Sequence, residues 1–374
     1  MNAIVWGRNH NNALGLVWSL GEAGHDVYLI LLRSDINYVD KSKYVKQCIY
    51  IDSYEYKTVI EAVKRVVKLL LGKPILFSTD DDGASLINEN YNEFSKYCLV
   101  GGIEGIHELN KYISKSKMNE LAMSFGLNIP QTWIVDSPDY IPVDMTFPVF
   151  VKAENSIRGG KSVIHICKSQ DDLLLVLKSF NIDIFPILIQ EYINKTNEIL
   201  LLGCSLYQGE VFCSIGLNKI RQSFGYGATV FANSFLADND SMYNAILTKI
   251  NRMIRHVGYV GLFSAEFIIS DNKEYFLEIN FRNDGTSYLS TKCGCNLPDL
   301  FCKSFLSNSV SQFDYHPHYY MNLTLDMINV VKRKIGFIRW IKDFNRTDCF
   351  SHFNKNDIKP YLYHLLSVIY SKIK

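Results

Sequence analysis

The most informative segment of this chain is Ser264-Ala-Glu-Phe-Ile-Ile-Ser-Asp-Asn-Lys-Glu-Tyr-Phe-Leu-Glu-Ile-Asn-Phe-Arg282. Two strand-like runs flank the turn-like residues 270–273, and this pattern predicts a β-hairpin. If the hairpin is symmetric about Asn272, Glu266 and Glu278 lie directly opposite each other. Like charges in that position destabilise a sheet, and a divalent cation is the natural compensator for two carboxylates.

Asn280 follows Glu278 by two residues, so both side chains lie on the same face of the predicted strand. A set of oxygen ligands from Glu266, Glu278 and Asn280 is typical of a Mg²⁺ site. The alternative is that one glutamate lies in a bulge and points to solvent, because symmetry alone sets the register. The segment therefore predicts a metal site, with a solvent-facing glutamate as the competing interpretation.

Other segments suit the phosphate groups that such a metal usually meets. Lys152 ends the apolar segment 147–152, where its stem can lie against the core while the ammonium reaches a ligand. Gly159 and Gly160 follow, and their backbone amides can approach an anion closely. For Lys152, a strand-end lysine in water is the competing interpretation.

Three further cations are candidates for binding a phosphoryl or carboxylate group. Arg282 lies two residues beyond Asn280 and continues its face, with an ion pair to Asp284 as the alternative. Lys219 and Arg221 alternate with a period of two, which places both on one side of an extended segment. We expect Arg221, together with Lys219, to bind a substrate carboxylate, and a plain surface loop is the alternative.

The N-terminal part of the chain alternates strands and helices. Residues 3–6 and 27–32 read as strands on either side of a helix, a βαβ unit that predicts a parallel sheet. Only Gly7 and Gly15 are present where the dinucleotide fingerprint needs three glycines at fixed spacing. We therefore expect residues 1–112 to form one open parallel α/β domain that lacks this fingerprint.

The composition of the 374 residues excludes several classes of protein. Apolar residues make up 48% and charged residues 21%, which excludes disordered and fibrous chains. A net charge of +1 gives no global field that would attract nucleic acid, so we expect no nucleic-acid partner. No apolar run reaches the ~18 residues of a membrane span, and nine scattered cysteines favour a reduced, cytoplasmic protein.

The order of these motifs resembles the ATP-grasp superfamily over roughly residues 112 to 300. The resemblance is to its carboxylate–amine and amino-acid ligase type, and to the ATP-grasp domain of carbamoyl-phosphate synthase. Two more motifs carry it, Ser116-Lys117 before Gly126-Leu-Asn-Ile-Pro130, and Gln190-Glu-Tyr-Ile193. Phe281 stands where many members have proline, and this departure leaves the substrate open.

The resemblance implies a fold of α/β and α+β class. It places a pre-ATP-grasp domain before an ATP-grasp fold of two α+β subdomains, with a helical tail after them. The implied boundaries are 1–112 for the pre-ATP-grasp domain, 113–190 for the small lid subdomain, 191–312 for the large subdomain with the metal site, and 313–374 for a basic amphipathic helical segment.

The resemblance also implies roles for individual residues. Lys117 and Lys152 would bind the ATP phosphates, under a glycine-rich lid that contains Ser156, Gly159 and Gly160. The other implied roles are adenine binding by Glu191, Tyr192 and Ile193, ribose binding by Glu198, binding of one or two Mg²⁺ ions (with Mn²⁺ as a substitute) by Glu266, Glu278 and Asn280, and catalysis by Arg282 and Lys152.

The activity that the resemblance implies is ATP-dependent ligation. The γ-phosphoryl group moves to a small-molecule carboxylate, and an amine attacks the acyl phosphate to form an amide, releasing ADP and phosphate. Two alternatives stay open, a non-catalytic ATP-binding module and bicarbonate chemistry of the carbamoyl-phosphate or carboxylase type. Arg282 argues against the first, because a module that only binds has little need for it.

Residues 327–374 form a locally basic segment with ten Lys and Arg against three Asp. One apolar helical stripe runs from Ile328 to Ile338, and a second runs from Leu362 to Ile373. We expect these helices to pack on the core or on a partner subunit, as in a homodimer. The alternative is a peripheral membrane contact or a lipid-linked substrate.

Overall fold

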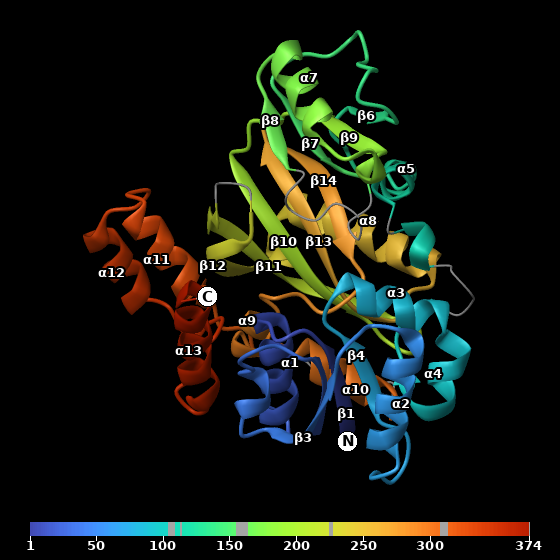
Figure 1. Ribbon diagram of the computed structural model, residues 1–374. Helices are drawn as coiled ribbons and strands as arrows, with labels where there is room; N and C mark the ends of the chain where they lie inside the picture. The colour runs from blue at the N-terminus through green and yellow to red at the C-terminus, as the bar shows by residue number, and fades with distance from the viewer. Residues whose placement is uncertain (104–108, 113, 155–163, 224–226, 307–312, 374) are drawn as a thin grey trace.

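The computed structural model describes residues 1–103, 109–112, 114–154, 164–223, 227–306 and 313–373 (Figure 1). Three β-sheets organise this part of the chain. A parallel sheet lies at one end of the molecule and a four-stranded antiparallel sheet at the other, with the largest sheet between them (Figure 1).

The first sheet is parallel throughout, as the N-terminal pattern predicts. Its strands are β1 (Asn2–Gly7), β2 (Asp26–Leu32), β3 (Val45–Ile51), β4 (Ile75–Ser78) and β5 (Leu99–Val100), in the order β3-β2-β1-β4-β5. Its helices are α1 (Asn11–Glu22), α2 (Tyr56–Val67), α3 (Asp81–Glu89) and α4 (Tyr91–Tyr97). The strand order reverses between β1 and β4, and ligands of open α/β sheets bind beyond the carboxyl ends of strands at such a point.

The second sheet contains four antiparallel strands. They are β6 (Thr132–Val135), β7 (Val149–Ala153), β8 (His165–Cys167) and β9 (Ile187–Glu191), in the order β6-β9-β7-β8, and they accompany helices α5 (Lys115–Ser124) and α7 (Gln170–Ser179). Val149 pairs with Cys167, so β7 and β8 are antiparallel neighbours. The lid residues Ser156, Gly159 and Gly160 lie outside the described residues.

The third sheet has seven strands in the order β14-β13-β10-β11-β12-β15-β16. Their bounds are β10 (Asn197–Ser205), β11 (Val211–Gln222), β12 (Thr229–Leu236), β13 (Gly261–Ser270), β14 (Lys273–Asn280), β15 (Tyr319–Met321) and β16 (Cys349–Phe350). Helix α8 (Ser241–Val257) packs its apolar side against this sheet, where Ile250 joins Phe267 and Phe276 in one buried cluster. The helices α9 (Tyr288–Lys292) and α10 (Leu297–Ser304) follow the hairpin of β13 and β14.

The first and third sheets share a continuous core. Leu16 of α1, Leu202 of β10 and Phe301 of α10 belong to one buried cluster, and none of them is more than 2% exposed. Burial of apolar side chains on both sides of α1 gives this helix a fixed position between the two sheets. The loops that follow β1 and β14 are therefore held against each other.

The C-terminal segment contains the helices α11 (Leu323–Val331), α12 (Phe337–Asn345) and α13 (Lys359–Ile373), as predicted. The stripe from Ile328 to Ile338 does not belong to a single helix, because the chain turns at Arg333, whose φ is 54°. The sequence also gave no sign of β15 and β16, which are too short to show an alternating pattern. Trp340 of α12 packs against Phe231 at this edge of the third sheet.

Four short 3-10 helices complete the secondary structure in the described residues, η1 (Val39–Lys41), η2 (Leu109–Tyr112), η4 (Ile182–Ile184) and η6 (Ala237–Asn239). All nine cysteines are unpaired and eight of them are buried, which fits the expectation of reduced core cysteines. None of the helices in the described part of the chain combines the length and apolarity needed to cross a bilayer.

Candidate active site

The hairpin of β13 and β14 places Glu266 opposite Glu278, as predicted. Asp271 and Asn272 form its turn with φ values of 50° and 58°, so the hairpin is centred between them rather than on Asn272. A bulge at Leu277 then adds one residue to β14. The bulge shifts the register by one position, and this shift brings the two glutamates face to face.

Glu266 is compensated by a lysine that sequence reasoning had assigned to the substrate. The Lys219 ammonium donates to Glu266 Oε2 at 2.6 Å and to Glu198 Oε1 at 2.9 Å. Burial lowers the pKa of Lys219, but Glu266 and Glu198 raise it by more, so the lysine stays charged. Burial also raises the pKa of Glu266, and Lys219 opposes this shift. Lys219 therefore forms ion pairs with two predicted site residues, Glu198 and Glu266.

Glu198, the predicted ribose ligand, lies in the same buried ion network. Lys195 donates to its Oε2 at 2.8 Å, and Gln222 donates to its Oε1 at 3.0 Å. Burial raises the pKa of Glu198, but Lys219 and Lys195 outweigh this effect and bring the pKa below its ordinary value. Glu198 is thus an ionised acceptor whose two oxygens already have donors.

Glu278 has a different environment. No hydrogen bond or ion pair joins its carboxylate to any residue that the structure describes. Burial raises its pKa, but the charges of Lys115, Lys152 and Arg282 lower it by more, so the group is ionised at neutral pH. Glu278 is surrounded by positive charge without being bound by it, which leaves room for a further ligand among these groups.

Two lysines lie near Glu278, one in the second sheet and one in helix α5, which accompanies that sheet. Burial lowers the pKa of Lys152 in β7 to about 8, and Glu278 opposes that shift. Lys115, the first residue of α5, lines a cavity together with Glu278, whereas Lys117 is exposed. The structure thus brings Lys115, rather than the predicted Lys117, to the site. The repeat Ser-Lys-Ser-Lys at residues 114–117 gave the sequence no basis for choosing between them.

The start of α5 is fixed to the end of β7 by a carboxylate. Glu154, two residues beyond Lys152, accepts from the hydroxyl groups of Ser114 and Ser116, the latter at 2.9 Å. Ser114 is the N-cap of α5, so these contacts satisfy donors at the helix start. The same contacts hold Lys115 and Lys152 at neighbouring positions around Glu278.

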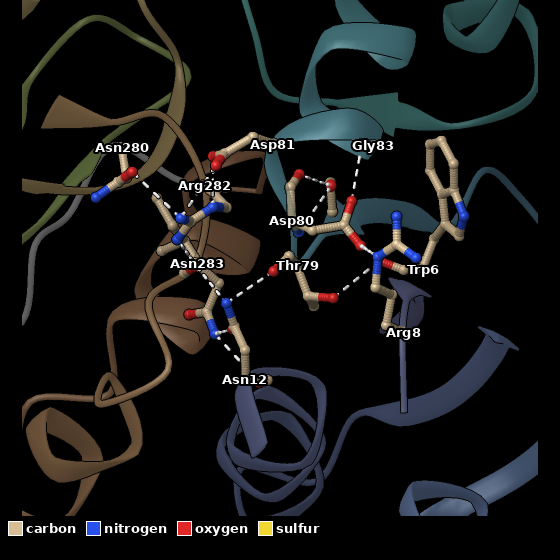
Figure 2. Close-up of polar contacts among 12 residues, drawn as sticks. Trp6, Arg8, Asn12, Thr79, Asp80, Asp81, Gly83, Asn280, Arg282 and Asn283 are labelled. Atoms are coloured by element: carbon tan, nitrogen blue, oxygen red, sulfur yellow. Dashed lines mark hydrogen bonds and ion pairs between the residues drawn. The ribbon is translucent and has the colours of Figure 1, made fainter. Parts of the chain in front are cut away.

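Arg282 joins the hairpin to the first domain (Figure 2). Its Nε donates to Asp81 Oδ1 at 2.7 Å, and its Nη2 donates to Asn280 Oδ1 at 3.2 Å. Asp81 lies 201 residues away in the chain, at the start of α3. Arg282 therefore forms its ion pair with Asp81 and not with Asp284, the alternative partner. The sequence did not predict the pair with Asp81.

Asn12 fixes the loop that carries Arg282. Its Nδ2 donates to the carbonyl of Asn283 at 2.7 Å and to the carbonyl of Thr79 at 2.8 Å (Figure 2). These atoms are buried, so each unmade hydrogen bond would be costly. Asn12 thereby connects three segments at the point where the strand order of the first sheet reverses.

Arg221 lies outside this constellation. Its Nε donates to Asp326 at 3.0 Å, and its other nitrogens bind Asp326 and Asp343. A bulge at Ile220 separates it from Lys219, so the two side chains do not share one side of β11. The donors of Arg221 are used within the protein, so the structure gives no support to the prediction that it binds the substrate carboxylate.

The segment predicted to bind adenine connects the second sheet to the third. Glu191 ends β9, and its backbone N–H donates to the carbonyl of Gln131 at 2.8 Å. Tyr192 is exposed and Ile193 is half-buried. The segment therefore borders the space between the two sheets, and the adenine contact stays a prediction.

The donor set beside the glutamates fits a hard cation. Glu278 offers an ionised carboxylate and Asn280 an amide oxygen on the same face of β14. Ser264, which pairs with Asn280, is fully buried, and its hydroxyl has no partner among the described residues. The described residues hold no cluster of three or more His, Cys, Asp or Glu suited to a metal, so Mg²⁺ here would need phosphate and water ligands as well.

No family model matches the sequence. A curated relative, the formate-dependent phosphoribosylglycinamide formyltransferase of Prochlorococcus marinus, is 24% identical over 196 residues. That alignment covers 50% of this chain and 45% of the relative. The chain spans about half the length of the curated relatives it matches.

Solved structures are similar over most of the chain. The L-amino acid ligase from Bacillus licheniformis matches with a TM-score of 0.63 at 14% identity, covering 82% of this chain and 74% of that one. The N5-carboxyaminoimidazole synthetase from Staphylococcus aureus, complexed with ADP, matches with a TM-score of 0.66 at 15% identity, covering 89% and 86%. This chain has the ATP-grasp fold. The predicted fold class, α/β and α+β with the parallel domain first, is confirmed.

Within the ATP-grasp fold, the hairpin residues of the site were visible in the sequence and their supports were not. Lys115, Asp81 and Asn12 come from three other segments. Each lies at the start of a helix and is a residue type that is common on protein surfaces. Only their positions around the hairpin and its loop distinguish them from ordinary residues at a helix start.

Proposed function

We propose that this chain is an ATP-dependent ligase that activates a carboxylate as an acyl phosphate and joins it to an amine. One observation carries the proposal, the ionised Glu278 set among Lys115, Lys152 and Arg282 without a direct partner in the described residues. A metal–triphosphate needs this combination, because its phosphate oxygens require cations and its metal requires a carboxylate.

ATP would bind between the second and third sheets. The Lys152 ammonium makes no hydrogen bond within the described residues, and a phosphate oxygen would provide one and raise its lowered pKa. Lys115 would bind the same group of phosphates. Mg²⁺, when held by Glu266, Glu278 and Asn280, would offset the charge of the β- and γ-phosphates.

The remaining nucleotide contacts follow the sequence prediction. The segment from Glu191 to Ile193 would hold adenine, and Glu198 would accept from the ribose while keeping its lysine partners. The lid containing Ser156 and Gly160 would cover the phosphates. Exclusion of water matters here, because an acyl phosphate is hydrolysed readily.

Arg282 would act on the transferring group. A carboxylate oxygen of the substrate attacks the γ-phosphorus, the bond to the β-phosphate oxygen breaks, and ADP and an acyl phosphate form. An amine then attacks the acyl carbon, phosphate leaves with the bonding electrons, and the amine proton passes to solvent. The guanidinium would stabilise the charge that develops in both steps, and Asp81 would hold it in position.

The amine substrate would bind in a second cavity of about 640 Å³, at the carboxyl ends of β1 and β2. Side chains of α11 and α13 close it from the other side, with Thr324 and Ser367 among them. Asn11, also in its lining, donates to the carbonyl of Gly285 at 3.0 Å, so the cavity adjoins the loop that carries Arg282.

The second cavity suits a neutral or cationic polar group, because Asp35 is the one acidic side chain in its described lining. Its lining includes His352 and His364, whose rings stack with centroids 3.8 Å apart. Burial lowers the pKa of His364 to about 4 and that of His352 well below its ordinary value, so both are neutral at pH 7. No Lys or Arg is found among the described lining residues. Ser367→Trp should therefore raise the KM of the amine several-fold without changing ATP affinity.

The test of the proposed function is ADP and phosphate release from Mg-ATP with pooled amino acids, amines and carboxylates, followed by mass spectrometry. We expect ADP release that depends on two added compounds, with a product mass equal to their sum less water. ATP binding without turnover in any pool would instead favour the non-catalytic module.

Bicarbonate chemistry is the second candidate function. It is favoured by the similarity to the N5-carboxyaminoimidazole synthetase, whose name describes a carboxylated product. The same assay separates the two candidates. ADP release that requires bicarbonate and an amine, with no other carboxylate present, would select the second candidate.

A further inference from the structure

The three C-terminal helices carry an unusual surface. They project from one side of the molecule, beyond the edge of the third sheet (Figure 1). Of the 27 large apolar side chains that are exposed in the described residues, 14 lie between residues 327 and 370. They are Met327, Ile328, Val331, Phe337, Ile338, Ile341, Phe344, Ile358, Leu362, Tyr363, Leu365, Leu366, Ile369 and Tyr370. We call this surface the C-terminal face.

Helix α12 directs an apolar side toward solvent. Trp340 and Asp343 are its buried residues, whereas Phe337, Ile338 and Ile341 are exposed, with Ile338 at 75%. A helix that only packed on the core would bury the apolar side and expose the polar side. The apolar side of α12 is therefore left for contact with something outside the described chain.

Helix α13 repeats this arrangement. Leu362, Leu366 and Ile369 are exposed and lie at helical spacing on one face, while His364 on the other side is buried. Contiguous exposed apolar residues on monomeric proteins usually mark an interaction surface. The expectation that these helices pack on the core thus holds for their inner sides only.

The C-terminal face is basic because cations outnumber the three aspartates of this segment, and two of these aspartates, Asp343 and Asp357, are buried. Asp343 is bound by Arg221 and Arg346, Asp357 accepts from the indole of Trp18, and Asp348 pairs with a histidine. The cations at residues 339, 342, 346, 355 and 359 are exposed. Exposed apolar and cationic side chains therefore share this surface, and Asp348 is the one exposed carboxylate among its described residues.

We propose that the C-terminal face docks on an anionic membrane surface. Amphipathic helices with Lys and Arg beside Trp, Phe and Leu lie in the headgroup region, where apolar burial and attraction to anionic lipids act together. Phe337 and Ile338 would enter the boundary of the acyl chains, and Arg339 and Lys342 would meet lipid phosphates. The proposed contact is a peripheral one, with the helices lying in the headgroup region.

A second copy of this chain is the main competing occupant. In a two-fold dimer the same surface meets itself. Arg339 and Lys342 would then face an equally basic partner, and like charges at a buried interface oppose association. An anionic membrane supplies the opposite charge together with an apolar layer, which matches both properties of the face.

Flotation of the full chain with vesicles tests the proposal. We expect binding to vesicles of phosphatidylcholine mixed with phosphatidylglycerol at low salt, and much weaker binding to phosphatidylcholine alone. Ile338→Glu combined with Leu366→Glu should abolish flotation. The matched control, Leu71→Glu with Val143→Glu, changes side chains that are 98% and 95% exposed outside the face, and it should float like the parent.

The charge contribution is measured separately. Arg339→Gln combined with Lys342→Gln should weaken binding to the anionic vesicles roughly fivefold per charge, since each contributes about 1 kcal/mol near such a surface. ATP binding by all these variants should be unchanged, because the face shares no residue with the nucleotide site. A failure of the proposed ligase activity would therefore leave this test intact.

Three outcomes would overturn the proposal. The first is absence of flotation with anionic vesicles at low salt. The second is equal binding to neutral and anionic vesicles, which would remove the role of the cations. The third is a dimer in solution without lipid that Ile338→Glu converts to a monomer, which would assign the face to a second copy.

Discussion

The hairpin of β13 and β14 and the strand β11 contain the same irregularity with opposite consequences. In the hairpin, the bulge at Leu277 brings Glu278 opposite Glu266. In β11, the bulge at Ile220 turns the next residue away from Lys219 and toward the C-terminal helices. An alternating pattern therefore identifies the two faces of a strand only as far as the next bulge.

The two regions also differ in how their charges are satisfied. Arg221 and Lys219 have direct carboxylate partners, whereas Glu278 and Lys152 have none among the described residues. Charges that form ion pairs within the protein stabilise its structure. Charges without a direct partner, which we call open charges, are suited to binding a ligand of opposite charge. The following substitutions test this distinction.

Glu278→Gln should have the largest effect. Loss of the open carboxylate should reduce ADP release at least about 10²-fold, as expected when a charge that stabilises the transition state is removed. Glu274→Gln is the matched control on the same strand, because Glu274 pairs with Lys249 away from the site. Equal ADP release by the two variants, measured with the chain folded, would contradict the site.

Arg221→Ala should affect stability and leave catalysis unchanged. The substitution leaves the buried Asp326 without its ion-pair partner and leaves Asp343 with Arg346 alone, so the free energy of unfolding should fall by about 3 kcal/mol. Urea denaturation measures this loss, and the KM for ATP should match that of the parent. A raised KM for ATP with an unchanged free energy of unfolding would indicate that Arg221 belongs to the active site.

Lys152→Met should stabilise the ligand-free chain and abolish its response to ATP. The folded pKa of about 8 lies below the ordinary value of 10.5, so the lysine destabilises the folded state fully below pH 8 and less as the pH rises toward 10.5. At pH 7 the variant should gain about 2 kcal/mol, after allowance for partial exposure of the side chain. Thermal unfolding with and without Mg-ATP measures both the gain in stability and the stabilisation by ATP. A variant that ATP still stabilises would show that Lys152 does not bind the phosphates.

Lys115→Ala and Lys117→Ala form the finest comparison. Removal of Lys115 should weaken Mg-ATP binding about tenfold, the effect of losing one charge-assisted contact. Removal of the exposed Lys117 should change it by less than about twofold. Calorimetric titration measures both affinities. A larger loss of affinity in Lys117→Ala than in Lys115→Ala would show that Lys117 binds the phosphates, as the sequence predicted.

Local patterns were sufficient for most of the elements and for the facing pair of Glu266 and Glu278. The alternation of strands and helices predicted the parallel sheet, and the two strand-like runs around residues 270–273 predicted the hairpin with its facing glutamates. The facing pair was predicted correctly although the assumed centre was off, because the bulge restored the register that a shifted turn would have lost.

Contacts between distant segments were beyond sequence reasoning. The Arg282–Asp81 pair spans 201 residues, and nothing near either residue marks its partner. The same holds for Asn12 and the loop after β14, and for the carboxylates that occupy Arg221. Each depends on which sheets share a core, and this is a property of the whole packing arrangement.

The sequence by itself determined the order of strands and helices, the apolar faces and the types of residue available for chemistry, because these follow from periodicity and side-chain character within short segments. The tertiary structure decided which charges are closed into ion pairs and which stay open, and which helix faces stay exposed. Those outcomes depend on burial, bulges and long-range register, and these exist only once the segments have packed together.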